Sequence, residues 1–160
     1  MRQRRRQNGF GGGCSHRQKP SDAIQYVTPG TTADHPYPTL TKNYHYEIVL
    51  VAVLDKGGRN VGIEQALALV YGYTIGLDMT RRDLQRAMGD EKKPWEIGKS
   101  FDRSAPIGPI HPVARVGQAF ELMPGDIIYS GTPENVGPVV VGDVMQGSIA
   151  GLPTLDVRVV

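Results

Sequence analysis

Apolar and polar residues alternate over residues 44–54, "YHYEIVLVAVL", where β-branched side chains are frequent. Such a run is typical of a β-strand. One face of this strand would carry, by alternation, His45, Glu47, Val49, Val51 and Val53. Glu47 is the anomaly on a face that otherwise looks buried. Its carboxylate must be paired, protonated or bound to a cation, unless it lies at the strand end and reaches solvent.

Residues 63–71, "IEQALALVY", repeat apolar side chains at helical spacing instead. The pattern predicts a short amphipathic helix that packs on the preceding strand and ends at Gly72. The apolar run "YTIGL" over residues 73–77 then predicts a second strand. A second helix is expected over residues 80–88.

Turn-forming residues dominate the rest of the chain. Twenty glycines and twelve prolines among 160 residues favour many turns and short strands over long helices. Residues 91–112 are expected to form a loop interrupted by prolines. A strand is expected within "LMPGDIIYSGTP", after its Pro-Gly turn, and short strands joined by tight turns are expected over residues 139–160. These elements predict a β-rich α+β fold with few short helices.

One domain is expected, over residues 18–160, preceded by a disordered basic arm over residues 1–17. The arm supplies much of the net charge of +2, so the body is nearly neutral and no nucleic-acid surface is indicated. A transit peptide is a weaker alternative for the arm. No run approaches the roughly 20 apolar residues that span a bilayer. The single cysteine, Cys14, excludes an internal disulfide and fits a reducing compartment, so a cytoplasmic protein is expected.

The segment "DMTRRDLQ", residues 78–85, follows an apolar run and is rich in charge. On a helix, Arg82 and Gln85 lie on roughly one face, below the Asp78 that precedes the first turn. A carboxylate, a guanidinium and an amide could therefore converge there. The alternative is a capped surface helix with solvated charges. In that helix, Thr80 and Asp83 would resemble a capping box with aspartate in place of the usual glutamate.

Two further segments carry candidate chemistry that is weak in isolation. Lys99 lies in "GKSFD", a setting in which a lysine is usually solvated. Residues 130–137, "SGTPENVG", offer backbone amides and hydroxyls that could hold an anion or oxyanion, although most such loops are only turns. The loop matches neither a Walker loop nor a dinucleotide fingerprint.

Taken together and in this order, the motifs resemble those of the fumarylacetoacetate hydrolase family. They are "YHYE", "GYTIGLDMTRRDLQ", "GKSFD", "PIGPI" and "LMPGDIIYSGTP". Each is weak alone, but five in the right order are specific, and they run from about Gln18 to Val160. Within the family, "PYPTLTKN" and "GLDMTRRDLQ" look most like the fumarylpyruvate hydrolase branch.

The resemblance implies layered mixed β-sheets, a homodimer, and hydrolysis of a carbon–carbon bond in acylpyruvates such as fumarylpyruvate, in aromatic compound catabolism. It also implies Mg²⁺ (or Mn²⁺ or Ca²⁺) as cofactor and a small oxo-acid as substrate. By matching motif positions, it assigns the metal to Glu47 and Asp78, with Lys99 in catalysis. The same matching assigns substrate contacts to Arg82, Gln85, Lys99 and Thr132.

His45 is a candidate base, because the strand alternation places it on the face of Glu47. A role in orienting that metal ligand competes with this interpretation.

The chain departs from the family pattern in three ways. Val49 stands where the family has the second glutamate of an E-x-E metal pair. Nothing over residues 1–20 matches the family's lid histidine and glutamate, since no glutamate follows His16 at helical spacing. A strand pair and most of a helix are missing between Gly117 and Gln118, so the chain is expected to be internally shortened. These departures predict weak metal binding and low turnover. The alternative is a non-catalytic remnant that binds oxo-acids or a partner chain.

Overall fold

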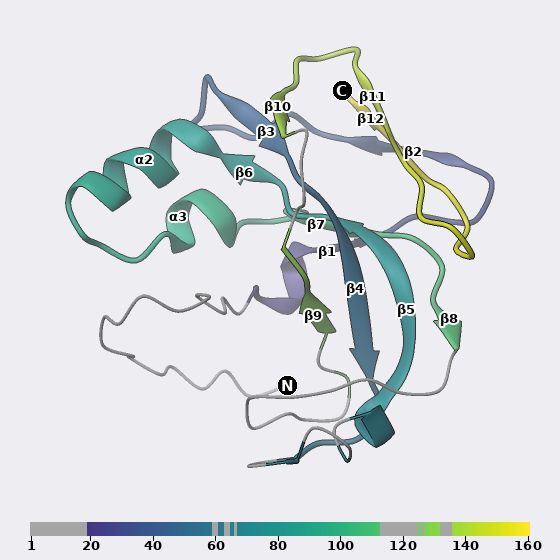
Figure 1. Cartoon of the computed structure of the whole chain (residues 1–160). Helices are drawn as coiled ribbons and strands as arrows, with labels where there is room; N and C mark the ends of the chain where they lie inside the picture. Colours follow the sequence, from purple (N-terminus) through teal and green to yellow (C-terminus); the bar gives the residue numbers. More distant parts are fainter. Residues whose placement is uncertain are drawn as a thin grey trace.

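A computed structural model describes residues 19–58, 61–62, 65, 67–112, 125, 127–131 and 136–160 of the chain. The expected arm over residues 1–17 and the expected break at residues 117–118 both lie outside this described part. Short strands outnumber helices in it (Figure 1). None of its helices is long and apolar enough to cross a membrane.

The largest sheet has six strands and is built around the long pair β4 (Ile48–Leu54) and β5 (Val70–Leu77). The strand order is β1-β7-β5-β4-β9, and β8 also pairs with β5. Its other members are β1 (Ile24–Tyr26), β7 (Ala105–Ile107), β8 (His111–Pro112) and β9 (Ile127–Tyr129). The pair β1–β7 is parallel and the remaining pairs are antiparallel, so the sheet is mixed.

Two three-stranded sheets complete the fold. One has the order β10-β3-β6, with β3 (Tyr44–Tyr46), β6 (Thr80–Arg81) and β10 (Gly137–Pro138). The other has the order β11-β12-β2, with β2 (Thr32–His35), β11 (Val144–Gly147) and β12 (Leu155–Val159). The helical segments are η1 (Ser21–Ala23), η2 (Leu67–Leu69), α2 (Arg82–Asp90) and α3 (Glu96–Lys99). The predicted β-rich α+β fold of layered mixed sheets is confirmed.

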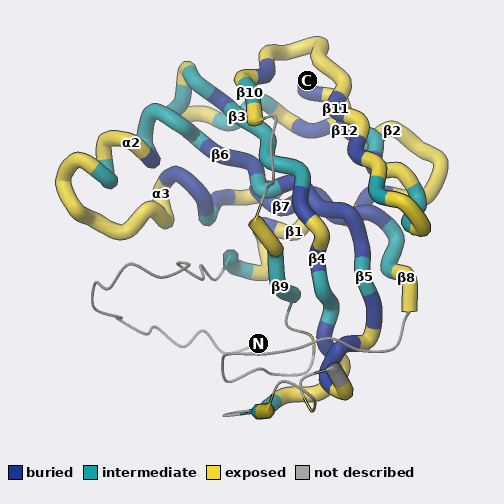
Figure 2. Tube along the Cα trace, in the orientation of Figure 1, coloured by how far each residue is buried: buried dark blue, intermediate teal, exposed yellow. Residues whose placement is uncertain are grey.

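The main core lies where the three sheets meet, and β5 is buried along most of its length (Figure 2). Its members come from β3, β5, β11 and β12 and from loops: Val27, Tyr44, Ile75, Leu77, Met79, Phe101, Val139, Met145, Leu155, Val157 and Val159. A smaller cluster of Val49, Val51 and Ile107 covers the other face of β4. The predicted alternation of residues 44–54 therefore holds, because Tyr44 and Tyr46 pack on one side and Val49 and Val51 on the other.

The predicted helix over residues 63–71 is wrong at its end. Leu67–Leu69 form a single 3-10 turn, and Val70 already pairs with Leu54 as the first residue of β5. Pairing with β4 satisfies this backbone better than the helical turn that its apolar spacing suggested. Gly72, expected to end a helix, lies inside β5, where a Cβ would clash with the carbonyl oxygen of His111.

The expected loop over residues 91–112 is also wrong in part, because it contains α3, β7 and β8. Pro106 lies in the middle of β7, and Pro112 is the last residue of β8. Such strands tolerate proline where its missing N–H is not needed for pairing. The strand expected after the Pro-Gly turn is β9, and those expected over residues 139–160 are β11 and β12.

Candidate active site

Two carboxylates lie next to each other where β3 joins β4 and where β5 ends. Ile48 and Leu77 form the last register pair of β4 and β5, and the Asp78 amide then donates to the Glu47 carbonyl at 2.8 Å. Glu47 and Asp78 are thus neighbours across the strands, and both side chains are largely buried, at 18% and 21% exposed. The strand-end alternative for Glu47, a side chain reaching solvent, is therefore wrong.

Lys99 joins the two carboxylates. Its ammonium donates to Glu47 Oε2 and to Asp78 Oδ2, both at 2.9 Å. The residue ends α3, and its side chain is only 3% exposed. A solvated lysine, the usual case for such a loop, is therefore excluded. A buried ammonium in contact with two carboxylates is a fixed positive charge at the centre of the cluster.

Arg82 and Gln85 enter the cluster from the first turn of α2. The Arg82 guanidinium donates to Glu47 Oε1 at 2.7 Å and to Gln85 Oε1 at 2.7 Å. Their spacing of three positions lets the two side chains meet on one helix face, as predicted. The structure therefore brings together Glu47, Asp78, Arg82, Gln85 and Lys99; the roles given to them remain predictions.

Lys19 is a member of the cluster that sequence reasoning missed. Its ammonium lies 2.7 Å from Asp78 Oδ1 and donates to the Ser104 carbonyl at 2.8 Å and to Ser104 Oγ at 3.2 Å. Burial lowers its pKa to about 8, against the opposing effect of Asp78. A lysine beside a proline, far from Asp78 in the sequence, carries no pattern that would have revealed this contact, which depends on tertiary packing.

The cluster is more positive than negative. Three cationic side chains, Lys19, Arg82 and Lys99, surround the two carboxylates. Burial would raise the pKa of Asp78, but the charges and hydrogen bonds of Lys19 and Lys99 outweigh it and hold that pKa below its usual value. This excess of positive charge suits a small anion, above all one that presents two negatively charged oxygens.

The contacts of His45 do not support a role in orienting Glu47. Its Nε2 lies 2.8 Å from Asn43 Oδ1, and Nδ1 is buried with no hydrogen-bond partner among the described residues. Burial and the charges of Arg82 and Arg86 lower its pKa, against the effect of Glu47. The imidazole therefore favours the neutral form, as a base requires, but no hydrogen bond of the described residues joins it to either carboxylate.

Asp83 fixes the start of α2 without forming the predicted capping box. The helix begins at Arg82, its N-cap Arg81 makes no side-chain capping bond, and Thr80 Oγ1 donates to the Asp78 carbonyl instead. The Asp83 carboxylate accepts from Thr41 Oγ1 at 2.5 Å and from the Lys42 amide at 2.9 Å. This contact ties the loop before β3 to α2 and so fixes Arg82 relative to Glu47.

A divalent cation fits the donor chemistry of the cluster in part. Glu47 and Asp78 offer hard carboxylate oxygens, and the buried Asp78 Oδ1 meets only the Lys19 ammonium, 2.7 Å away, among the described residues. Val49 adds nothing, because it is 3% exposed and packs against Val51 and Ile107. No group of three or more acidic, histidine or cysteine side chains suited to a metal exists within the described residues. Thr132 lies outside them.

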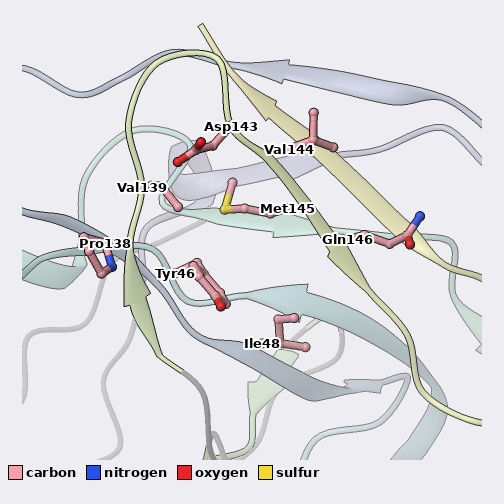
Figure 3. A pocket seen from close by; sticks show the side chains of 8 residues that line it. All are labelled: Tyr46, Ile48, Pro138, Val139, Asp143, Val144, Met145 and Gln146. Atoms are coloured by element: carbon pink, nitrogen blue, oxygen red, sulfur yellow. The ribbon is translucent and has the colours of Figure 1, made fainter.

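A separate hollow of about 260 Å³ lies on the other face of β3 and β4 (Figure 3). It is lined by Tyr46, Ile48, Pro138, Val139, Asp143, Val144, Met145 and Gln146. None of the predicted site residues lines this hollow. The candidate site is therefore the charged cluster.

Comparison with known proteins agrees with the motif order. The sequence model described as fumarylacetoacetate (FAA) hydrolase C-terminal matches residues 15–113 and 110–160. A fumarylpyruvate hydrolase of Ralstonia sp is 35% identical over 158 residues, covering 77% of this chain and 82% of the relative. A mitochondrial oxaloacetate tautomerase of Bos taurus is 29% identical over 181 residues, and the match covers 88% of this chain and 82% of the relative.

Solved structures share the fold. Fumarylpyruvate hydrolase from Pseudomonas aeruginosa, crystallised in complex with Mn²⁺ and pyruvate, superposes with a TM-score of 0.83 at 44% identity. The match covers 89% of this chain and 76% of that one.

Proposed function

The chain belongs to the fumarylacetoacetate hydrolase family, and from this premise we propose that it hydrolyses a carbon–carbon bond in acylpyruvates, with fumarylpyruvate as the first candidate, in aromatic compound catabolism. The relatives support this choice of substrate, since a fumarylpyruvate hydrolase is among them and another such enzyme binds Mn²⁺ and pyruvate. The proposal includes a divalent cation, Mg²⁺ or Mn²⁺, and a homodimer in the cytoplasm.

The observation that carries the proposal is the position of the Lys99 ammonium, 2.9 Å from both Glu47 and Asp78, with Arg82 on the far side of Glu47. A 2-oxo acid needs positive charge for its carboxylate and for the oxygen that becomes an enolate. Arg82 is suited to the carboxylate because its guanidinium can bind two oxygens at once. Gln85 fixes that guanidinium through its own hydrogen bond.

Glu47 and Asp78 would hold the cation, which would polarise the oxo group of the substrate. Lys99 lies against both carboxylates and is positioned to stabilise negative charge as the pyruvate leaves as an enolate. Because Lys99 is buried, its ammonium acts in a setting with little water, where such an interaction is stronger. The proton of the attacking water needs an acceptor, and the neutral imidazole of His45 is the candidate base in the described part of the chain.

A second candidate function is binding without turnover. It is favoured by Val49, whose buried apolar position removes one carboxylate from the expected metal set. In that case the cluster would bind oxo-acids through Arg82 and Lys99, while hydrolysis would be slow or absent.

The deciding experiment follows the enol absorbance of fumarylpyruvate with purified protein and saturating Mg²⁺ or Mn²⁺. Asp78→Ala is the blank, and oxaloacetate is offered in parallel because a relative is an oxaloacetate tautomerase. Metal-dependent loss of the enol that the blank lacks supports hydrolysis. Binding of pyruvate or oxalate in calorimetry, with no turnover of either substrate, supports the second candidate instead.

A further inference from the structure

Tyr129 carries a buried hydroxyl on the same face of the sheet as the charged cluster. The residue lies on β9 directly opposite Val51 of β4. Side chains of residues that face each other in an antiparallel pair point to the same side of the sheet. That side carries Val49 and, one alternation further, Glu47. The phenol ring therefore belongs to the site side of β4.

The ring extends toward the end of β5, where Asp78 lies. Gly76, two positions before Asp78, has no side chain, and a Cβ there would come 2.9 Å from Cε1 and 3.3 Å from Cζ of Tyr129. Because Cζ carries the hydroxyl, the far end of the ring lies over Gly76. The negative charge of Asp78 is close enough to add to burial in raising the pKa of Tyr129.

The Tyr129 hydroxyl is unpaired within the described part of the chain. Its oxygen is buried and has no hydrogen-bond partner among the described residues. The ring alone would serve the cluster of Val49, Val51 and Ile107, against which it packs. A phenylalanine would fill that space as well, and an unpaired buried hydroxyl is unfavourable. The position of this hydroxyl therefore indicates a hydrogen-bond partner on a bound ligand.

We propose that the Tyr129 hydroxyl donates a hydrogen bond to an oxygen of the bound oxo-acid, beside Asp78. The inference rests on the proposed function of the same site and adds to it a neutral donor from a third element, β9. Arg82 and Lys99 supply positive charge from the helices, whereas Tyr129 supplies a directional hydrogen bond from the sheet. The bond would help to select a planar oxo-acid over other small anions.

The test compares Tyr129→Phe with the wild-type protein in two measurements: oxalate binding by calorimetry in saturating Mn²⁺, and thermal unfolding without ligand. We expect the Kd for oxalate to rise about three- to tenfold, the range for one lost neutral hydrogen bond. The melting temperature should stay equal or increase, because the variant removes an unpaired hydroxyl.

Tyr73→Phe is the matched control. The Tyr73 hydroxyl is also buried without a hydrogen-bond partner in the described part of the chain, and its ring packs against the cluster of Leu54, Leu69 and Val70. Its removal should leave oxalate affinity unchanged. Arg82→Met, expected to weaken oxalate binding strongly, verifies that the assay reports on the site.

Three outcomes would overturn the inference. Unchanged oxalate affinity in Tyr129→Phe, with a loss in Arg82→Met, rejects the role of Tyr129 and leaves the proposed function standing. A clear drop in melting temperature for Tyr129→Phe shows that the hydroxyl already has a partner in the free protein. A wild-type protein that binds no oxalate rejects the proposed function together with the inference.

Discussion

At the scale of single residues, burial decides what each ionisable group of the cluster can do. Lys99 and the two carboxylates are removed from most water, so each charge depends on its neighbours. Taking one charge away leaves the others unpaired, and this costs more than the pair itself contributes. Stability and ligand binding at this site are therefore linked through the same side chains.

Replacing Lys99 with methionine tests this link. We expect Lys99→Met to lower the free energy of unfolding by about 3 kcal/mol, because it leaves Glu47 and Asp78 facing each other without their shared ammonium. Urea unfolding measures the change, and added Mn²⁺ should recover part of it by supplying positive charge. Lys93→Met, at a lysine whose side chain is 60% exposed, is the control and should change stability little. Equal effects of the two variants would contradict the prediction.

Val49→Glu restores the carboxylate that the family pattern has at this position. Without metal we expect the variant to be less stable, because the new charge enters an apolar cluster. Its affinity for Mn²⁺ should rise by about tenfold or more, since a third carboxylate adds both a ligand and a charge. Val51→Glu, one alternation further along β4 and fully buried, should lose stability without the gain in affinity. If calorimetry shows the same Mn²⁺ affinity for Val49→Glu and wild type, position 49 does not belong to the metal site.

His35 predicts a dependence of stability on pH. The imidazole is 1% exposed, lies between Tyr44 Oη at 2.6 Å and Gln25 Oε1 at 2.8 Å, and has its pKa lowered by burial to about 4. The unfolded chain binds this proton near pH 6.5, so folding is favoured above that pH and loses stability as the pH falls from 6.5 to 4. The loss should reach about 3 kcal/mol. Unfolding at several pH values should show a steeper decline in wild type than in His35→Gln; parallel curves would refute the assignment.

At the scale of elements, local patterns predicted strands better than the helix ends and the cluster geometry. The alternation over residues 44–54 predicted the face that carries Glu47, but the single strand expected there is divided at Glu47 into β3 and β4, which belong to different sheets. The helical spacing over residues 63–71 misled, because pairing with β4 extends β5 back to Val70. Gln85 and Arg82 could be paired from their spacing. Lys19 and Tyr129 could not be predicted in this way, because both are far from Asp78 in sequence and approach it only through the tertiary fold.

The close approach of α2 and α3 gives a test at this scale. A Cβ on Gly98 would come 2.9 Å from both the Cβ and the amide nitrogen of Gln85. We therefore expect Gly98→Ala to cost about 1–3 kcal/mol and to weaken oxalate binding, because α3 carries Lys99. Gly89→Ala is the matched control: its nearest contact is 3.4 Å, and alanine favours a helix more than glycine does. Urea unfolding that shows a loss for Gly89 and none for Gly98 would contradict this account.

At the scale of the whole molecule, the core depends on one strand from near the far end of the described chain. The side chains of Leu155, Val157 and Val159 are fully buried in the main cluster. Through β12, these residues join β11 on one side and β2 on the other. The three sheets therefore share one cooperative unit rather than separate halves.

A chain that stops after residue 154 should not reach the native fold. It would lose three fully buried apolar side chains and leave β2 and β11 without their shared neighbour. At about 1.5–3 kcal/mol for each buried side chain, the loss is comparable to the whole stability of a domain. Circular dichroism and near-ultraviolet spectra of the shortened chain are the measurement. A cooperative unfolding transition in that chain would contradict the prediction.

The parallel pairing of β2 with β12 also constrains the order of events during synthesis. Thr32 lies opposite Asp156 and His35 lies opposite Val159, so an early strand must wait for a late one. While the ribosome is still adding the intervening residues, β2 has no partner along that edge, and the apolar side chains of the main cluster remain exposed to water. The nascent chain would thus stay exposed to chaperones and proteases until residues 155–159 leave the exit tunnel, and folding around β12 would begin only then.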